Sequence, residues 1–199
     1  MTFDLFETMP RGVLIVIAAP SGCGKTTIAR AVLQRHPAML FSVSATTRPI
    51  RSGEVHGKDY FFLSRQEFES RIVAGDLVEH EEIYGNLYGT LKSEVDRALA
   101  KGCVMLFDVD VKGALSIRRM YPDDTLLIFI QPPSLEELER RLTDRKTEDA
   151  ATVARRMARV PLELKLGKEF DVRVVNDVLD RAIEEVDAVI RNRTEGVLN

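Results

Sequence analysis

An apolar strand that runs directly into a glycine-rich loop and a helix constrains this chain more than any other feature. The strand is expected at 12–18 (GVLIVIA), where apolar residues at every position suit burial on both faces of a parallel sheet. The next residues, 19–26, read APSGCGKT, and a helix is expected from Thr26 to His36. This order matches the Walker A phosphate-binding loop in the context that it requires. The sequence therefore predicts a nucleotide site at the end of the first strand.

Each part of this loop has chemistry that suits a polyphosphate. Gly22 and Gly24 let the backbone approach phosphate oxygens, and the helix N-terminus adds partial positive charge. Lys25 is predicted to contact the transferred phosphoryl group, and the Thr26 hydroxyl to ligate Mg²⁺. Ala19 departs from the strict pattern, which has glycine there, and a methyl group is tolerable if φ stays negative. We expect ATP to be bound by the whole loop: Ala19, Pro20, Ser21, Gly22, Cys23, Gly24, Lys25 and Thr26.

Cys23 allows two interpretations. Neighbouring N–H groups and Lys25 should favour its thiolate, which would then be alkylated quickly unless nucleotide protected it. Alternatively, Cys23 is a small residue that fills the loop. The chain has 2 cysteines in 199 residues, which excludes a disulfide framework.

Strands and helices alternate along much of the chain. Three further apolar runs are typical of buried strands, at 103–110, 125–130 and 172–175, and shorter strands are expected at 41–44, 60–63 and 77–84. Capping boxes predict helix starts at 64–67 and 134–137, and further helices are expected at 91–101, at 155–165 and around Ile183. Pro161 should kink the helix at 155–165 or end it early. The pattern predicts an α/β fold with a parallel sheet covered on both faces, interrupted from Ala45 to Glu94 by an inserted lobe.

Charge and hydropathy exclude several classes of protein. Lys and Arg number 28 against 31 Asp and Glu, and this net charge of −3 argues against nucleic-acid or membrane-surface binding. The longest apolar run, Val13 to Ala19, is far shorter than the ~20 residues of a membrane span. The first ten residues carry Asp4 and Glu7 and no basic segment, unlike a secretory signal. We expect a cytoplasmic protein with no nucleic-acid or membrane partner.

Two arginines in the interrupting segment form a candidate anion clamp. Arg48 and Arg51 flank Pro49 and Ile50, and guanidinium groups bind phosphate oxygens in a bidentate manner. Tyr60 and Tyr88 could help them to hold one phosphate. The Walker A loop identifies a phosphate donor, so this second cluster is a candidate site for the acceptor.

Several motifs together resemble the guanylate kinase family. They are the phosphate loop, Ser-x-Thr-Thr-Arg-x-x-Arg at 44–51, Gly-x-x-Tyr-Gly at 85–89, Asp-Val-Asp at 108–110 and Val-Asn-Asp at 175–177. The resemblance runs from about Gly12 to the C-terminal helix. It implies a P-loop kinase core with a five-stranded parallel sheet flanked by helices, formed by 1–44 and 96–199. It also implies an inserted mixed α/β GMP-binding lobe at 45–95 and a helical arginine lid at about 140–160.

The resemblance implies an ATP:GMP phosphotransferase of purine nucleotide metabolism that makes GDP from GMP or dGMP with Mg²⁺, as a monomer or homodimer. The matching acceptor-site residues are Ser44, Arg48, Arg51, Tyr60, Glu79, Tyr88, Thr90 and Asp110, with Asp108 expected to orient metal-bound water. Guanine presents two adjacent donors, N1–H and the 2-amino group, which one carboxylate can accept, whereas adenine would leave Glu79 facing a lone pair. The sequence alone favours a solvated strand residue beside Glu81 and Glu82 as the interpretation of Glu79, and only the resemblance reverses this.

A basic segment at 140–159 stands out in this acidic protein. It has three acidic residues against seven basic ones, Arg140, Arg141, Arg145, Lys146, Arg155, Arg156 and Arg159. Cations over the moving phosphoryl group are the main requirement of phosphoryl transfer, and a lid also excludes water. The family resemblance points to Arg145, Arg156 and Arg141 as catalytic, beside Lys25 and Arg48, and to Asn176 as an adenine contact.

Two rival functions remain open. A related kinase could act on another small phosphorylated acceptor, such as a ribose phosphate, but it should lack Glu79 and the hydroxyls of Ser44 and Thr90. A non-catalytic guanylate-kinase-like module could bind a protein partner, but such modules typically lose the lysine at position 25.

Overall fold

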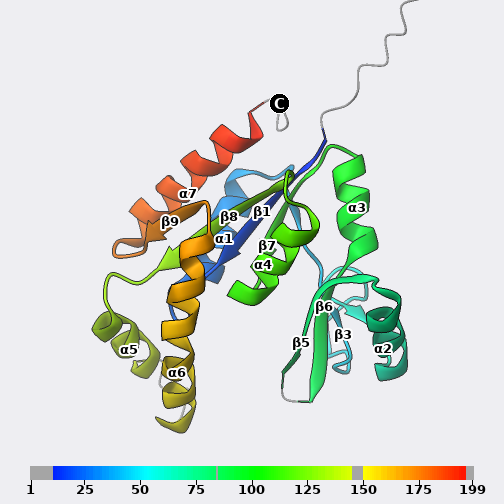
Figure 1. Cartoon of the computed structure of the whole chain (residues 1–199), viewed down its shortest axis with the longest axis horizontal. Coiled ribbons are helices and arrows are strands. Elements are labelled where there is room, and N and C mark those ends of the chain that lie inside the picture. Colours follow the sequence, from blue (N-terminus) through cyan, green and yellow to red (C-terminus); the bar gives the residue numbers. More distant parts are fainter. Residues whose placement is uncertain (1–10, 84, 145–149, 196–199) are drawn as a thin grey trace, which may run out of the picture.

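The computed structural model describes residues 11–83, 85–144 and 150–195. They form a five-stranded sheet with helices on both faces and a smaller sheet beside it (Figure 1). Within these residues, no helix has the length and apolar character needed to cross a membrane.

The larger sheet is built around the first apolar strand. Its order is β2 (Leu40–Phe41), β7 (Val104–Asp108), β1 (Val13–Ala18), β8 (Thr125–Gln131) and β9 (Val172–Val175), and all neighbours are parallel. Every residue of β1 is buried, as its unbroken apolar sequence requires. The prediction of a five-stranded parallel sheet flanked by helices is confirmed.

Alternate residues of β1 enter two separate hydrophobic cores. Ile15 and Ile17 face one side, which also holds apolar residues of α1 (Lys25–Arg35) and α7 (Leu179–Thr194). Leu14 and Val16 face the other side, with α3 (Lys92–Ala100) and α4 (Val111–Met120). This two-residue period fixes the carboxyl end of β1, and with it the phosphate loop, between two packed layers.

The smaller sheet has the order β4 (Phe61–Phe62), β3 (Ala45–Thr46), β6 (Asn86–Leu91) and β5 (Leu77–Ile83). Its β3–β4 pair is parallel and its other pairs are antiparallel. Helix α2 (Arg65–Ala74) packs on it through Phe68 and begins with the predicted capping box of Ser64 and Glu67. The core of this unit is small: Ala45, Phe68, Leu77, Leu87 and Leu91.

Some elements differ from the expectations. Helix α4 and strand β6 carry no strong local signal and were not predicted, and the strand expected at 41–44 ends at Phe41. Helix α5 (Leu135–Thr143) starts at its predicted capping residue, Ser134. Helix α6 (Ala150–Leu166) continues through Pro161 and leads into a short 3-10 turn, so the expected early end was wrong. Pro161 is exposed, and there proline removes one backbone hydrogen bond without disturbing the core.

Candidate active site

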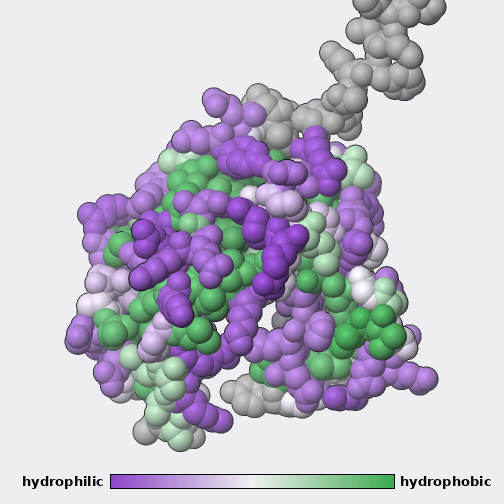
Figure 2. Space-filling view, viewed as in Figure 1, coloured by the Kyte–Doolittle hydropathy of each residue, from purple (hydrophilic) through white to green (hydrophobic). Residues whose placement is uncertain are grey.

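A cleft of about 670 Å³ lies between the phosphate loop, the end of β5 and helix α6. Its walls are the loop at 19–27, residues 81–83 and five residues of α6: Thr152, Arg155, Arg156, Arg159 and Glu163. Figure 2 shows the surface hollowed between α6 and the small sheet, with hydrophilic residues on both sides. Charged groups from separate elements therefore face one solvent-filled space.

The phosphate loop depends on backbone conformations that favour glycine. Gly22 and Gly24 have φ of 92° and 83°. A Cβ at Gly24 would also lie 2.5 Å from Nδ2 of Asn176, which donates a hydrogen bond to the carbonyl oxygen of Cys23 at 2.8 Å. Because Gly24 precedes α1 and has no side chain, the first turn of this helix is left open to an anion.

Lys25 and Thr26 meet the end of the neighbouring strand β7. Lys25 forms an ion pair with Asp108 and donates to the carbonyl oxygen of Val109 at 2.8 Å. The Thr26 hydroxyl donates to the other oxygen of Asp108 at 2.9 Å. The structure thus brings Lys25, Thr26 and Asp108 together at the carboxyl ends of parallel strands, where ligands bind in open α/β sheets.

Cys23 is buried at the base of the loop and is 1% exposed. Burial raises the pKa of its thiol to about 12, and the nearby Arg141 guanidinium offsets only part of this effect. The hypothesis of a reactive thiolate was wrong, because removal from water outweighs the positive charge around the loop. The side chain packs in the main core, as a small loop-filling residue would.

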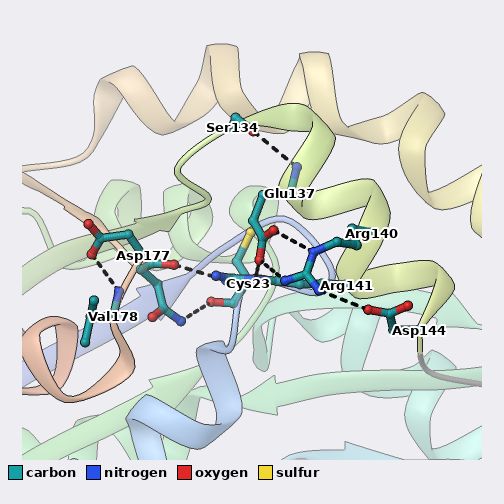
Figure 3. A network of polar contacts seen from close by, with 9 residues as sticks. Cys23, Ser134, Glu137, Arg140, Arg141, Asp144, Asp177 and Val178 are labelled. Carbon is teal, nitrogen blue, oxygen red and sulfur yellow. Dashed lines mark hydrogen bonds and ion pairs between the residues drawn. The ribbon is translucent and has the colours of Figure 1, made fainter.

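Arg141, in the last turn of α5, belongs to a polar network (Figure 3). It donates to Glu137 at 2.8 Å and to the carbonyl oxygen of Asn176 at 3.0 Å, and Arg140 also binds Glu137. These two arginines lower the pKa of Glu137 to about 2. Since Asn176 binds the loop at Cys23, the network links the start of the lid segment to the phosphate loop. The side-chain amide of Asn176, which is predicted to contact adenine, also donates a hydrogen bond to the loop.

Arg156 is the α6 arginine whose hydrogen bond reaches the phosphate loop. Its guanidinium donates to the hydroxyl of Ser21 at 2.8 Å. The Arg156 guanidinium, from the lid segment, therefore lies next to the phosphate loop on the side that faces the cleft. Arg145, the other arginine expected from this segment, lies outside the described residues.

The candidate anion clamp is organised by a carboxylate that the sequence reasoning missed. Arg48 binds both oxygens of Glu54, at 2.7 and 3.1 Å, and its guanidinium lies 5.3 Å from the ring centre of Tyr60. The ring of Tyr60 is 6.2 Å from that of Tyr88. Arg51 is exposed and contributes its backbone N–H to Glu54, at 2.7 Å. The spacing of Glu54, six and three residues after the two arginines, was the available signal.

Glu79 lies partly buried on β5, which excludes its reading as a freely solvated residue. The Thr90 hydroxyl donates to it at 2.6 Å. Burial raises the pKa of Glu79, and the nearby carboxylates of Asp110 and Glu81 raise it further. Asp110 itself caps α4 by accepting from the N–H of Gly113 at 2.7 Å. Ser44 lies just before β3, where its carbonyl oxygen accepts from the N–H of Phe61.

Comparison with known proteins decides the family. The family model described as Guanylate kinase matches residues 11–193. The chain belongs to the guanylate kinase family. It is 50% identical to guanylate kinase of Chlorobium luteolum over 91% of this chain and 92% of that protein. It is 52% identical to guanylate kinase of Salinibacter ruber, covering 92% and 97%.

A solved structure of the guanylate kinase family has the same fold. The crystal structure of guanylate kinase from Anaplasma phagocytophilum matches with a TM-score of 0.71 at 31% identity. The match covers 94% of this chain and 88% of that one. The likeness therefore extends over nearly the whole chain.

The loop in this guanylate kinase family member offers oxygen atoms that suit Mg²⁺. The Thr26 hydroxyl and the Asp108 carboxylate lie within hydrogen-bond distance of each other, and hydroxyl and carboxylate oxygens are ligands that Mg²⁺ accepts. Among the described residues, no group of three or more His, Cys, Asp or Glu side chains could hold a metal ion. These donors fit a Mg²⁺ that takes its remaining ligands from nucleotide phosphates and water.

Three charged residues of α6 that line the cleft, Arg155, Arg159 and Glu163, were not among the predicted site residues. Arg159 lies 3.5 Å from Asp110, 3.6 Å from Glu163 and 3.8 Å from Glu81. Burial raises the pKa of Glu163. The i, i+4 spacing of Arg159 and Glu163 was visible in the sequence and predicts a pair on one helix face. Their proximity to β5 and α4 depends on tertiary structure.

Proposed function

We propose that this chain transfers the γ-phosphoryl group of ATP to GMP or dGMP and releases ADP and GDP or dGDP, with Mg²⁺. The observation that carries the proposal is the pairing of Glu79 with Thr90 on the small sheet, on the strand β5 whose end lines the cleft opposite the phosphate loop. Two relatives that are 50% and 52% identical to this chain are named guanylate kinases, and this supports GMP as the acceptor here.

On the donor side, the loop at 19–26 binds the ATP phosphates. Loop N–H groups and the start of α1 face the phosphate oxygens, and Lys25 neutralises charge on the transferred group. Lys25 must exchange part of its pairing with Asp108 for the phosphate, which leaves Asp108 beside Thr26 to hold Mg²⁺ and its water. When bound there, Mg²⁺ would supply positive charge to the phosphate oxygens. Asn176 acts by fixing the loop next to the adenine side.

On the acceptor side, Glu79 accepts hydrogen bonds from the guanine N1–H and 2-amino group. Thr90 orients this carboxylate, and Ser44 and Asp110 complete the contacts to the nucleoside. The acceptor phosphate is held by Arg48, Arg51, Tyr60 and Tyr88. AMP is rejected because adenine would leave a partly buried carboxylate without a donor.

The transfer itself needs no general base from the protein. The second pKa of a phosphate monoester is about 6, so the attacking oxygen is already largely anionic at neutral pH. The protein has to bring two anions together, and the cations that do so are Lys25, Arg48, Arg141, Arg145 and Arg156. Arg156 is suited to this role by its contact with Ser21, whereas Arg141 supports the loop through Asn176.

We propose a division of the chain that follows these roles. Residues 1–44 and 96–199 form the core, with the lid at about 140–160, and 45–95 is the acceptor lobe. With these bounds, the second junction of the lobe, between residues 95 and 96, falls within α3 (Lys92–Ala100). The protein acts in purine nucleotide metabolism in the cytoplasm, as a monomer or homodimer.

The deciding experiment measures ADP release with ATP and each of GMP, dGMP, AMP, CMP and UMP. We expect strong turnover with GMP and dGMP and little with the others. Turnover on AMP and none on GMP would show another acceptor. Tight GMP binding without any ADP release would instead favour the non-catalytic module.

A further inference from the structure

Arg159 occupies a junction of three structural elements at the cleft. It projects from α6 and lies near Glu81 of β5, near Asp110, which caps α4, and near Glu163 of its own helix. The three distances, 3.5 to 3.8 Å, are nearly equal, so the guanidinium is shared among the carboxylates. Of the contacts around it, the pair with Glu81 joins the small sheet to α6.

The three carboxylates around Arg159 repel one another, and the positive charge of Arg159 offsets this repulsion. Glu163, Asp110 and Glu81 are mutually repulsive, and the last two add to the effect of burial in raising the pKa of Glu163. A cation among them converts this repulsion into attraction. Without Arg159, the end of β5 would face two carboxylates across the cleft.

The strand that Arg159 contacts also carries the guanine-reading candidate. Glu79 is two residues before Glu81 on β5, and side chains at this spacing share one face of a strand. Oε2 of Glu79 lies 3.4 Å from the place where a Cβ at Gly113 would be, so Glu79 faces the start of α4. A link at Glu81 therefore holds β5 in the position in which Glu79 faces the start of α4.

We propose that Arg159 is a positioning residue for the acceptor nucleotide, which acts through Glu81 by holding β5 against α6 and the start of α4. The inference rests on the proposed function, because it assigns acceptor binding to β5. It predicts a selective effect: loss of Arg159 weakens GMP binding and leaves ATP binding and the phosphoryl transfer step intact.

The first test compares Arg159→Gln with Lys165→Gln, which removes a positive charge from an exposed position of the same helix. Binding of GMP and of ATP is measured separately by calorimetry, without turnover. Since the Arg159 side chain is 57% exposed, we expect a roughly fivefold loss of GMP affinity, the size typical of partly screened ion pairs. ATP affinity and kcat at saturating GMP should change by less than about twofold. Lys165→Gln should bind both nucleotides like the wild type, and Arg159→Lys should restore part of the GMP affinity.

The second test asks whether Arg159 acts through Glu81. In a double-mutant cycle, Arg159→Gln should have little further effect on GMP binding once Glu81→Gln is present. An undiminished effect in that background would overturn the proposed route. An equal loss of ATP affinity, or a fall in kcat at unchanged GMP affinity, would show direct contact with the phosphates and overturn the positioning role.

These results separate the inference from the function on which it rests. Wild-type protein that fails to bind GMP contradicts the proposed acceptor. Wild-type protein that binds GMP, with an Arg159→Gln variant that binds it equally well, contradicts the role of Arg159 alone. Circular dichroism and thermal melting of each variant confirm that the compared proteins are folded.

Discussion

The phosphate loop and the acceptor-side arginines are both proposed anion sites, but they are built differently. The loop is fixed by contacts from distant parts of the chain: Asp108 to Lys25, Asn176 to Cys23 and Arg156 to Ser21. Arg48 is held by Glu54, six residues away, and stacks on rings of the same small unit. The loop also adjoins the main core, whereas the small sheet has a core of five buried residues.

This difference assigns separate tasks to the two regions. The backbone of the loop is fixed by distant contacts, so its N–H groups are preorganised for developing charge even though Lys25 must exchange part of its pairing with Asp108, and changes there should lower kcat. The Arg48 guanidinium is already paired with Glu54 of its own small unit, and an incoming phosphate must displace or join that carboxylate. Changes in this region should alter the KM for GMP more than kcat.

The largest effect is expected for Lys25→Met. Loss of a preorganised cation at the transferred group should lower kcat by about 10²–10³-fold, measured as ADP release coupled to NADH oxidation. Lys101→Met, an exposed position at the end of α3, is the matched control and should retain full activity. Activity within tenfold of the wild type would contradict the assignment of Lys25.

A smaller and acceptor-specific effect is expected for Glu79→Gln. The amide can accept only one of the two guanine donors well, so kcat/KM for GMP should fall about 10–100-fold while the KM for ATP is unchanged. The measurement is the ratio of kcat/KM for GMP to that for AMP. The control is Glu69→Gln, which changes an exposed glutamate of α2. If Glu79→Gln left the acceptor preference unchanged, the proposal that Glu79 recognises guanine would be refuted.

A weaker effect on the same side should follow Glu54→Gln. Glu54 orients Arg48 through two hydrogen bonds and also accepts from the backbone of Arg51. Its loss leaves Arg48 less ordered, and the KM for GMP should rise about three- to tenfold with little change in kcat. Steady-state kinetics at saturating ATP measure this split. A lower kcat at constant KM would place Arg48 on the reacting phosphoryl group instead of on the acceptor.

The smallest effect is one of stability and depends on pH. Because burial raises the pKa of Glu79, folded protein retains a proton that unfolded chain releases, so ionised Glu79 lowers stability as pH rises from 4.5 through the raised pKa. Glu79→Gln should therefore melt a few degrees above wild type at pH 8. This gap should close toward pH 4, where Glu79 is neutral, and a gap that widened on acidification would contradict the shift.

The sequence predicted local features well. The unbroken apolar run at 13–18 and the capping residues Ser64 and Ser134 each specify their element through neighbouring residues, and the structure has all three. Helix α4 was not predicted because its cap, Asp110, fell within the strand expected at 103–110 and its third residue is Gly113, which disfavours helix. Of the two effects predicted for Pro161, the early end does not occur, because α6 continues through it to Leu166.

Tertiary pairings of the site were beyond the reach of sequence patterns. The sequence does not distinguish Glu54 from the other acidic residues, because its pairing with Arg48 depends on the fold of the turn at 48–54. The thiol of Cys23 is surrounded by loop groups that suggest a thiolate, but the packing of distant helices against the loop decides its pKa. Glu79 could be assigned only through the family resemblance, since its burial depends on the approach of α4 to β5.

The hydrogen bond from Asn176 to Cys23 joins residues 153 positions apart. During translation, the strand, loop and helix that bind phosphate leave the ribosome long before Asn176 is made. The loop can gain this bond only after β9 has paired with β8 at the edge of the sheet. Nascent chains that stop short of Asn176 should therefore bind ATP poorly, which would delay nucleotide capture until almost the whole chain has been synthesised.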